Sequence, residues 1–145
     1  MVGLSVGTFR CTLLTPFGKL LDCKAGSLIA PGDDGLLGIL RNHAPMLCKL
    51  TRGIIQVKEI AGAEDAFYLI DGGFLRVSEN NATILAHDVT TFEGMTESEA
   101  KEVLSNARQI VVGKAYIQTQ TAGQTDLERA KLLVKLGIMA GIIAE

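Results

Sequence analysis

The sequence has no tryptophan and few other aromatic residues, so its hydrophobic core must be built mainly from aliphatic side chains. Aromatic residues make up 5% of the 145 positions, whereas 48% are hydrophobic. An excess of either charge is also missing, because 14 Lys and Arg stand against 16 Asp and Glu. These values exclude a strongly basic nucleic-acid-binding surface, an acidic tail and a disordered chain. The length predicts one domain, or one domain with an appendage.

Cysteine is scarce, and long hydrophobic runs and targeting signals are missing. Cys11, Cys23 and Cys48 are odd in number and form no C-x-x-C pair. We therefore expect small buried side chains in a reducing compartment, with a reactive thiol as the alternative. No segment reaches the roughly 18 apolar residues that a membrane span needs. The first residues lack the basic and long apolar stretches of a secretory signal.

Short apolar segments separated by turn residues fill the first 94 positions. Phe9, Cys11 and Leu13 alternate with more polar neighbours, as in a half-buried strand. Turn signals are expected at 16–18, 31–35, 61–65, 71–73 and 80–81, with strands over 9–14, 20–23, 27–30, 54–60, 67–70, 74–77 and 82–86. Strands at this spacing, of roughly 8–12 residues, predict an all-β sandwich or barrel.

The apolar period becomes helical after Gly94. Thr96 and Glu99 form a T-x-x-E capping box, and apolar residues then recur at helical spacing. A polar loop is expected over 118–124, and Thr125 with Glu128 forms a second capping box before a second helix. The predicted fold is therefore mainly β plus α: a β-sandwich over 1–94 and an antiparallel two-helix hairpin over 95–145. Such a hairpin is below the roughly 70–80 residues that sustain an independent core.

The last fourteen residues are apolar on more than one face. Between Leu132 and Glu145 only Lys135 and Glu145 carry charge. This segment is expected to pack within the hairpin and on the β unit, or to insert into a partner complex. The absence of a Lys/Arg-rich face argues against a membrane surface. Gly137 and Gly141 should each cost such a helix about 1 kcal/mol relative to alanine.

No residue pattern predicts catalysis, a metal site or a cofactor. His43 and His87 lack further ligands at metal-site spacing, and Cys48 with His43 lacks a third orienting group. The glycines at 32, 35 and 38 match neither the dinucleotide fingerprint nor the P-loop, and are interpreted as turn glycines. An enzyme using His43 or His87 remains the third alternative, after the two described below.

The segment from 35 to 47 is the most informative in the chain. It reads GLLGILRNHAPML and resembles the G-x-L-G-I-x-x-x-H-A-P-x-L signature of the epsilon subunit of bacterial rotary F-type ATP synthases. Three further segments resemble motifs of that family in the same order, namely Gly53–Ile55, Phe67–Val77 and Thr83–Ala86. The resemblance covers about residues 9 to 110, and the second helix in layout more than in sequence.

This resemblance implies a ten-stranded sandwich and a non-catalytic role. The sandwich would lie at the foot of the central stalk, against the gamma subunit and the c-ring, on the cytoplasmic side of the bacterial inner membrane. It would help to couple proton translocation to ATP synthesis. The loop from Asp33 to Ile39, with His43, would face the ring or gamma, and Leu36 stands where the family often has an acid. The implied contacts in the sandwich are Asp33, Asp34, Gly35, Leu36, Leu37, Gly38, Ile39 and His43.

For the hairpin, the resemblance implies a mobile element that can extend beside gamma, reach the catalytic alpha and beta subunits and inhibit ATP hydrolysis. Its expected contacts are Leu132, Leu136, Met139 and Ile143. Some family members bind ATP through a D-x-x-R-A string on the first helix. Here that string occurs only on the second helix, with Asp126 and Arg129.

A triphosphate needs several cations or amides to bind it, so Asp126 and Arg129 make a weak nucleotide site and tight ATP binding is not expected. The alternative function, from a different class, is a small ligand-binding β-barrel domain with a helical cap. That function would require a cavity lined by convergent polar groups, of which the sequence gives no sign.

Overall fold

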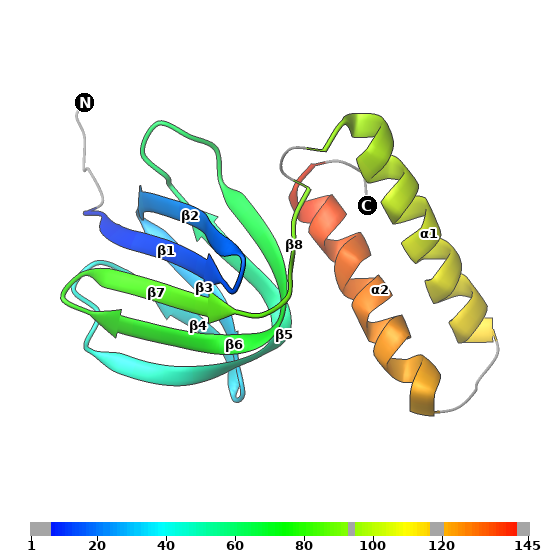
Figure 1. Cartoon of the computed structure of the whole chain (residues 1–145), viewed down its shortest axis with the longest axis horizontal. Coiled ribbons are helices and arrows are strands. Elements are labelled where there is room, and N and C mark those ends of the chain that lie inside the picture. Colours follow the sequence, from blue (N-terminus) through cyan, green and yellow to red (C-terminus); the bar gives the residue numbers. More distant parts are fainter. Residues whose placement is uncertain (1–6, 93–94, 117–120, 142–145) are drawn as a thin grey trace. The chain divides into compact units, whose positions relative to one another are not determined.

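The computed structural model describes residues 7–92, 95–116 and 121–141, and within 112–116 and 121–127 only the backbone. The chain divides into two compact units, Met1–Thr90 and Thr91–Glu145 (Figure 1). The first unit is built of strands and the second of helices. Each unit is described by itself below. The predicted fold class, strands followed by two C-terminal helices, is confirmed.

Eight strands in the described residues form one sheet that folds over to enclose a core. They are β1 (Phe9–Thr15), β2 (Gly18–Ala25), β3 (Ser27–Gly32), β4 (Gly35–Ile39), β5 (Met46–Lys58), β6 (Ala66–Ser78), β7 (Asn81–Ala86) and β8 (Val89–Thr90). Their order is β2-β1-β7-β6-β5-β3-β4, with β8 pairing on β6. The β1–β7 pair is parallel, and all others are antiparallel. The expectation of a β-sandwich with short strands is therefore met in fold class.

The count is eight rather than about ten because β5 and β6 are each 13 residues long. A break was expected at Asp71-Gly72-Gly73, yet β6 continues through it, with Arg52 opposite Asp71 and Leu50 opposite Gly73. Gly72 has a positive φ of 90°. A Cβ at Gly73 would overlap the backbone oxygen of Leu85 on β7. The two glycines thus let one long strand bend past its neighbour instead of ending it.

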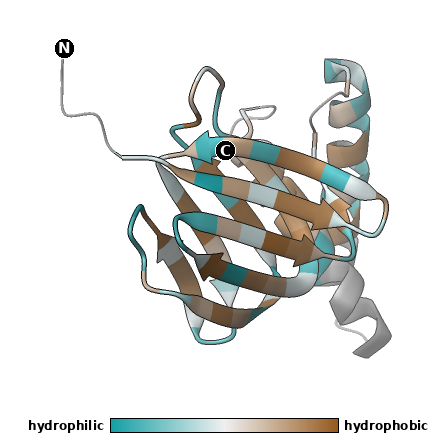
Figure 2. Ribbon diagram, turned by 60° about the vertical axis from the view of Figure 1, so that its left-hand side comes forward, coloured by the Kyte–Doolittle hydropathy of each residue, from teal (hydrophilic) through white to brown (hydrophobic). Residues whose placement is uncertain are grey.

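The core of the sandwich is aliphatic, as the composition predicts. Its largest fully buried side chains include Leu13, Leu28, Ile55, Ile70 and Ile84. Tyr68 and Phe9 are the aromatic members of the core cluster. Figure 2 shows the hydrophobic and hydrophilic residues alternating along the strands. Cys11 lies in this core, and Cys23 and Cys48 pack against it half-buried.

The second unit is a hairpin of α1 (Glu97–Tyr116) and α2 (Thr121–Met139). The first predicted capping box is confirmed: the Thr96 amide donates to Glu99 Oε2 at 2.9 Å, and the Glu99 amide donates to Thr96 Oγ1 at 3.2 Å. These bonds satisfy amides that a starting helix leaves without partners. Thr96 accordingly holds the pKa of Glu99 below its usual value.

The second predicted capping box is wrong. Helix α2 begins at Thr121, so Thr125 lies inside the helix and cannot be its N-cap. For the same reason 121–124 are helical rather than a polar loop, while 118–120 lie outside the described residues. The chain gives no apolar period in this stretch that would have marked the start.

The two glycines of α2 differ in role. Gly137 is buried, and a Cβ there would lie 2.7 Å from Leu104 Cδ1 of α1, so the missing side chain allows the helices to approach. Gly141 lies beyond the end of α2 with a φ of 77°, and its amide donates to the Ile138 carbonyl at 3.1 Å. Gly141 therefore terminates the helix, and the cost expected for a glycine inside a helix does not apply to it.

Candidate partner-binding surface

The loop predicted to face a partner is the β3–β4 hairpin. Asp33 and Asp34 form its exposed turn, and Gly35 opens β4 with a φ of 120°. Leu36 is 68% exposed at the strand end, and Gly38 faces open space. Leu37 is half-buried against the core. Ile39 is only 1% exposed and belongs to the core, so its prediction as a contact residue is corrected.

His43 lies in the loop between β4 and β5, apart from the β3–β4 turn along the chain. Its Nδ1 lies 2.7 Å from the Ala44 carbonyl oxygen, and its amide donates to the Leu40 carbonyl. The loop is tied to the β6–β7 turn: the Asn42 amide donates to Asn80 Oδ1 at 2.6 Å, and Asn80 Nδ2 donates to Asn42 Oδ1 at 3.2 Å. Both asparagines have positive φ, which asparagine tolerates better than most residues. These bonds fix the position of the His43 loop at one end of the sandwich.

The hairpin residues that were predicted to contact a partner are only partly exposed. Leu132 and Met139 are half-buried. Leu136 is fully buried, with 0% of its surface exposed, so in this conformation it cannot contact a partner. Ile143 and the side chain of Asp126 lie outside the described residues, and Arg129 is exposed. The weak nucleotide site of Asp126 and Arg129 therefore stays a prediction.

An apolar row on the outer face of the sandwich was not predicted. Leu14 of β1 lies opposite Leu85 of β7, which lies opposite Phe74 of β6. Residues paired across strands share one face of a sheet. Phe74 is 51% exposed and Leu85 50% exposed. Arg76 lies two residues beyond Phe74 on β6, on the same face, and its partner on β5 is Leu47, which is 72% exposed. We call Leu14, Leu47, Phe74 and Leu85 the outer apolar face.

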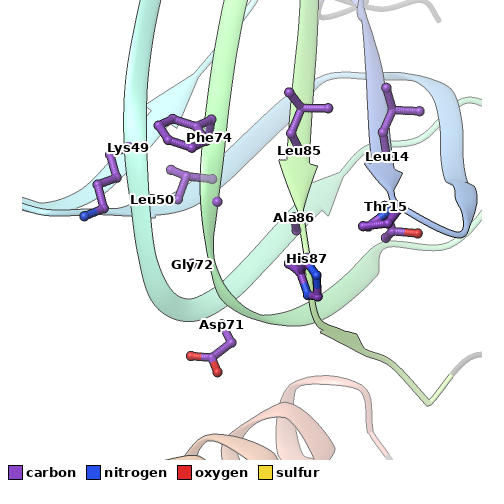
Figure 3. Close-up of a pocket in the computed structure, with 12 residues that line it drawn as sticks. Leu14, Thr15, Lys49, Leu50, Asp71, Gly72, Phe74, Leu85, Ala86 and His87 are labelled. Carbon is purple, nitrogen blue, oxygen red and sulfur yellow. The ribbon is translucent and has the colours of Figure 1, made fainter.

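A depression of about 600 Å³ opens on this face. In Figure 3 the side chains of Leu14, Leu85 and Phe74 stand across three neighbouring strands. The polar residues that line the depression are Thr15, Lys49, Asp71 and His87. Asp71 Oδ1 already accepts a bond from Arg52 Nε at 2.7 Å. Apolar residues that meet at an open surface suit the side chains of a protein partner better than a polar small molecule.

The sequence did contain a signal for the outer apolar face. Leu13-Leu14, Phe74-Leu75 and Ile84-Leu85 are adjacent apolar pairs in neighbouring strands. Since successive side chains point to opposite faces, such pairs place one apolar group in the core and one outside. The core partners are Leu13, Leu75 and Ile84. Three doublets in adjacent strands predict a sheet that is apolar on both faces.

The titratable residues form no catalytic cluster among the described positions. His87 Nδ1 lies 3.6 Å from Asp88 Oδ1, but both side chains are more than two-thirds exposed to solvent. Within the described ranges no three His, Cys, Asp or Glu side chains lie together as metal ligands. In the same ranges no helix is both long and apolar enough to cross a membrane.

Comparison with known proteins gives a consistent family. Residues 8–92 match the sequence model of the ATP synthase delta/epsilon chain β-sandwich domain. The ATP synthase epsilon chain of Campylobacter hominis is 34% identical over 68% of this chain and 76% of its own length. That of Chromohalobacter salexigens is 31% identical over 86% of this chain and 88% of its own.

A solved structure agrees in fold. One chain of the Euglena gracilis mitochondrial ATP synthase, from a structure of OSCP, F1 and the c-ring, superposes with a TM-score of 0.57. It is 18% identical, and the match covers 94% of this chain and 82% of that one. At this identity the superposition supports the two-unit fold alone.

Proposed function

Because this chain belongs to the ATP synthase delta/epsilon chain family, we propose that it acts in the central stalk as a non-catalytic subunit that couples proton translocation to ATP synthesis. The observation that carries the proposal is the family match over residues 8–92, which contains nearly the whole sandwich. Two relatives that are 34% and 31% identical to this chain are named epsilon chains of ATP synthase. A subunit of this kind acts by binding its partners. The outer apolar face and the exposed β3–β4 turn are surfaces suited to such binding.

The sandwich is the part that we assign to the stalk and the membrane ring. The solved structure of Tetrahymena thermophila that resembles this chain is described as a central stalk and c-ring, which supports these two partners. We assign the outer apolar face to the gamma subunit. Phe74, Leu85 and Leu47 are each at least half exposed there, and exposed apolar side chains that lie together mark a protein-binding surface. The β3–β4 turn with Leu36 and the His43 loop are assigned to gamma or the ring.

The hairpin is assigned a regulatory role at the catalytic alpha and beta subunits. It forms a unit separate from the sandwich, with α1 and α2 packed on each other. A unit of this size is near the lower limit for stability alone. The hairpin can therefore exchange between two docking surfaces that bind it with similar affinity. In one of these two bound states it would inhibit ATP hydrolysis. For the proposed role we assign the chain to the cytoplasmic side of a bacterial inner membrane, bound through its partners.

Co-purification tests the proposed function most simply. A tagged full-length chain should bring down the gamma subunit and the catalytic subunits of the ATP synthase from its own cells. Recovery of the chain without either of them would overturn the assignment to the stalk.

Removal of residues 95–145 tests the regulatory role by itself. The truncated chain should still enter the complex, because the sandwich is a compact unit, while ATP hydrolysis by the complex should rise. Unchanged hydrolysis with intact assembly would remove the inhibitory role and leave the stalk role in place.

A further inference from the structure

Two of the three cysteines lie directly opposite each other on neighbouring strands. Cys11 of β1 pairs with Cys23 of β2 in the antiparallel register. Opposed residues share one face of a sheet, and here that face is the core side, where Cys11 is fully buried and Cys23 packs half-buried. The Coulombic influence of Cys23 on Cys11 also reflects their proximity. Cys48, in contrast, lies opposite Leu75.

The spacing of such a pair is compatible with a covalent bond. Opposed residues in antiparallel strands have Cα atoms about 4.5 or 5.5 Å apart, depending on the hydrogen-bonding pattern. Disulfides span Cα separations of about 4.4–6.8 Å. The Cα separation of either kind of antiparallel pair therefore lies within the range that disulfides span. The strands need not move apart for the two sulfur atoms to bond.

We propose that Cys11 and Cys23 form a reversible cross-strand disulfide by exchange with a small-molecule disulfide such as oxidised glutathione. Cys23 reacts first, because it is partly exposed on the strand at the edge of the sheet, whereas Cys11 is shielded. Its thiolate attacks one glutathione sulfur, which forms a mixed disulfide and releases one glutathione thiolate.

Cys11 then completes the exchange from inside the sandwich. Its thiolate attacks the Cys23 sulfur, which forms the protein disulfide and releases the second glutathione thiolate. The two protons lost by the protein thiols end on the two glutathione molecules, so two protein thiols are oxidised and one glutathione disulfide is reduced. The reverse reaction with excess glutathione or dithiothreitol reopens the bond.

The rate of closure should depend strongly on pH. Burial raises the pKa of the Cys11 thiol to about 12, and burial also raises the pKa of Cys23. Since the thiolate is the attacking species, closure should be slow at neutral pH and faster at pH 9. The closed bond would fix the β1–β2 hairpin, whose Thr15 and Pro16 line the depression on the outer apolar face.

The test uses the full-length reduced chain, incubated with oxidised glutathione at pH 7 and pH 9. Intact mass should fall by two hydrogens, faster at pH 9, and non-reducing peptide mapping should show Cys11 linked to Cys23. Dithiothreitol should restore three free thiols. The oxidised chain should show slower amide exchange in β1 and β2.

The parent chain alone can confirm or overturn the proposal. Two cysteine variants then show which residues form the bond. Cys48→Ser should close as the parent does, and Cys23→Ser, at a half-buried position, should not close. Three thiols that stay free, a glutathione adduct that persists on Cys23, or a bond that involves Cys48 would each overturn the proposal.

Discussion

Glycine at position 73 is required by the strand that passes beside it. A Cβ there would overlap the Leu85 backbone oxygen, and backbone atoms cannot move aside as a side-chain end can. We expect Gly73→Ala to lower the free energy of unfolding of the sandwich by more than about 1 kcal/mol. Urea unfolding followed by circular dichroism measures the change.

Gly38→Ala is the matched control for this substitution. Gly38 also lies in a strand of the sandwich, but a Cβ there meets nothing within 4 Å. Its free energy of unfolding should stay within about 0.5 kcal/mol of the parent value. Equal losses in the two variants would contradict the account of the bend in β6.

Asp22 carries the clearest pH dependence among the described carboxylates. Arg10 donates to it at 2.9 and 2.7 Å and Lys19 at 3.0 Å, and these bonds hold its pKa well below the usual range. A folded-state pKa below the unfolded value of about 3.9 stabilises the fold above that pH, and the gain is lost on acidification. The stability difference between the parent and Asp22→Asn should therefore shrink from pH 5 to pH 2.

Glu64→Gln is the control for the acid series, since Glu64 is exposed in the turn between β5 and β6. Its unfolding midpoint in urea should track the parent at each pH. A parent–Asp22→Asn difference that stays constant across the acid range would argue against a role for the Arg10–Asp22–Lys19 cluster.

At the residue scale, the sequence predicted burial well where alternation was clear and poorly where it was ambiguous. Cys11 and Leu13 are buried as their alternation indicates. Ile39 was grouped with the surface loop because it follows Leu36 in a motif, but the strand register turns it inward. A motif identifies a segment, whereas the face of each residue depends on register that only the folded sheet fixes.

At the scale of elements, the start of α1 depends on its capping box. Thr96 Oγ1 accepts from the Glu99 amide, and Glu99 returns the bond to the Thr96 amide. We expect Thr96→Ala to destabilise the helix by about 1 kcal/mol. Amide exchange over the first turn of α1 should accelerate, whereas Ser98→Ala, an exposed change in the same turn, should leave it unchanged. Equal acceleration in both variants would exclude the box as the cause.

The packing of α1 on α2 gives a prediction with a change of sign. Alanine at 137 should favour the helix by about 1 kcal/mol, but its Cβ would lie 2.7 Å from Leu104 Cδ1. We expect Gly137→Ala to destabilise the hairpin in the parent chain, because overpacking costs about 1–3 kcal/mol. In a Leu104→Ala background the same change should stabilise it. Thermal unfolding of the four chains provides the cycle, and the same sign in both backgrounds would contradict it.

Elements with local signals were predicted, and those set by distant contacts were not. Thr96 with Glu99 marks a helix start through neighbours three positions apart. The start of α2 at Thr121 has no such mark, so the sequence placed it at the T-x-x-E string four residues later. The glycines at 72 and 73 look like a strand end, but pairing with β5 and β7 carries β6 through them. Tertiary pairing overrides the local preference there.

At the scale of the whole molecule, the fold class of a β-sandwich with two C-terminal helices was predictable, while the outer apolar face was not. The change of apolar period after Gly94 separates the strands from the helices in the sequence. The outer face brings together Leu14, Leu85 and Phe74 from three strands. Their neighbourhood depends on the sheet order β1-β7-β6, which includes a parallel pair that local patterns do not reveal.

The central claim is that the outer apolar face binds the gamma subunit. The most direct test compares the affinity of the full-length Phe74→Glu chain for gamma with that of the parent chain. Phe74 is 51% exposed, so glutamate should be tolerated by the fold and act at the surface. Ala63→Glu adds the same charge to the exposed turn between β5 and β6 and is the control. The account predicts that Phe74→Glu weakens binding by at least about 30-fold, near 2 kcal/mol, while Ala63→Glu binds as the parent. Parent-like affinity of a folded Phe74→Glu chain would contradict it.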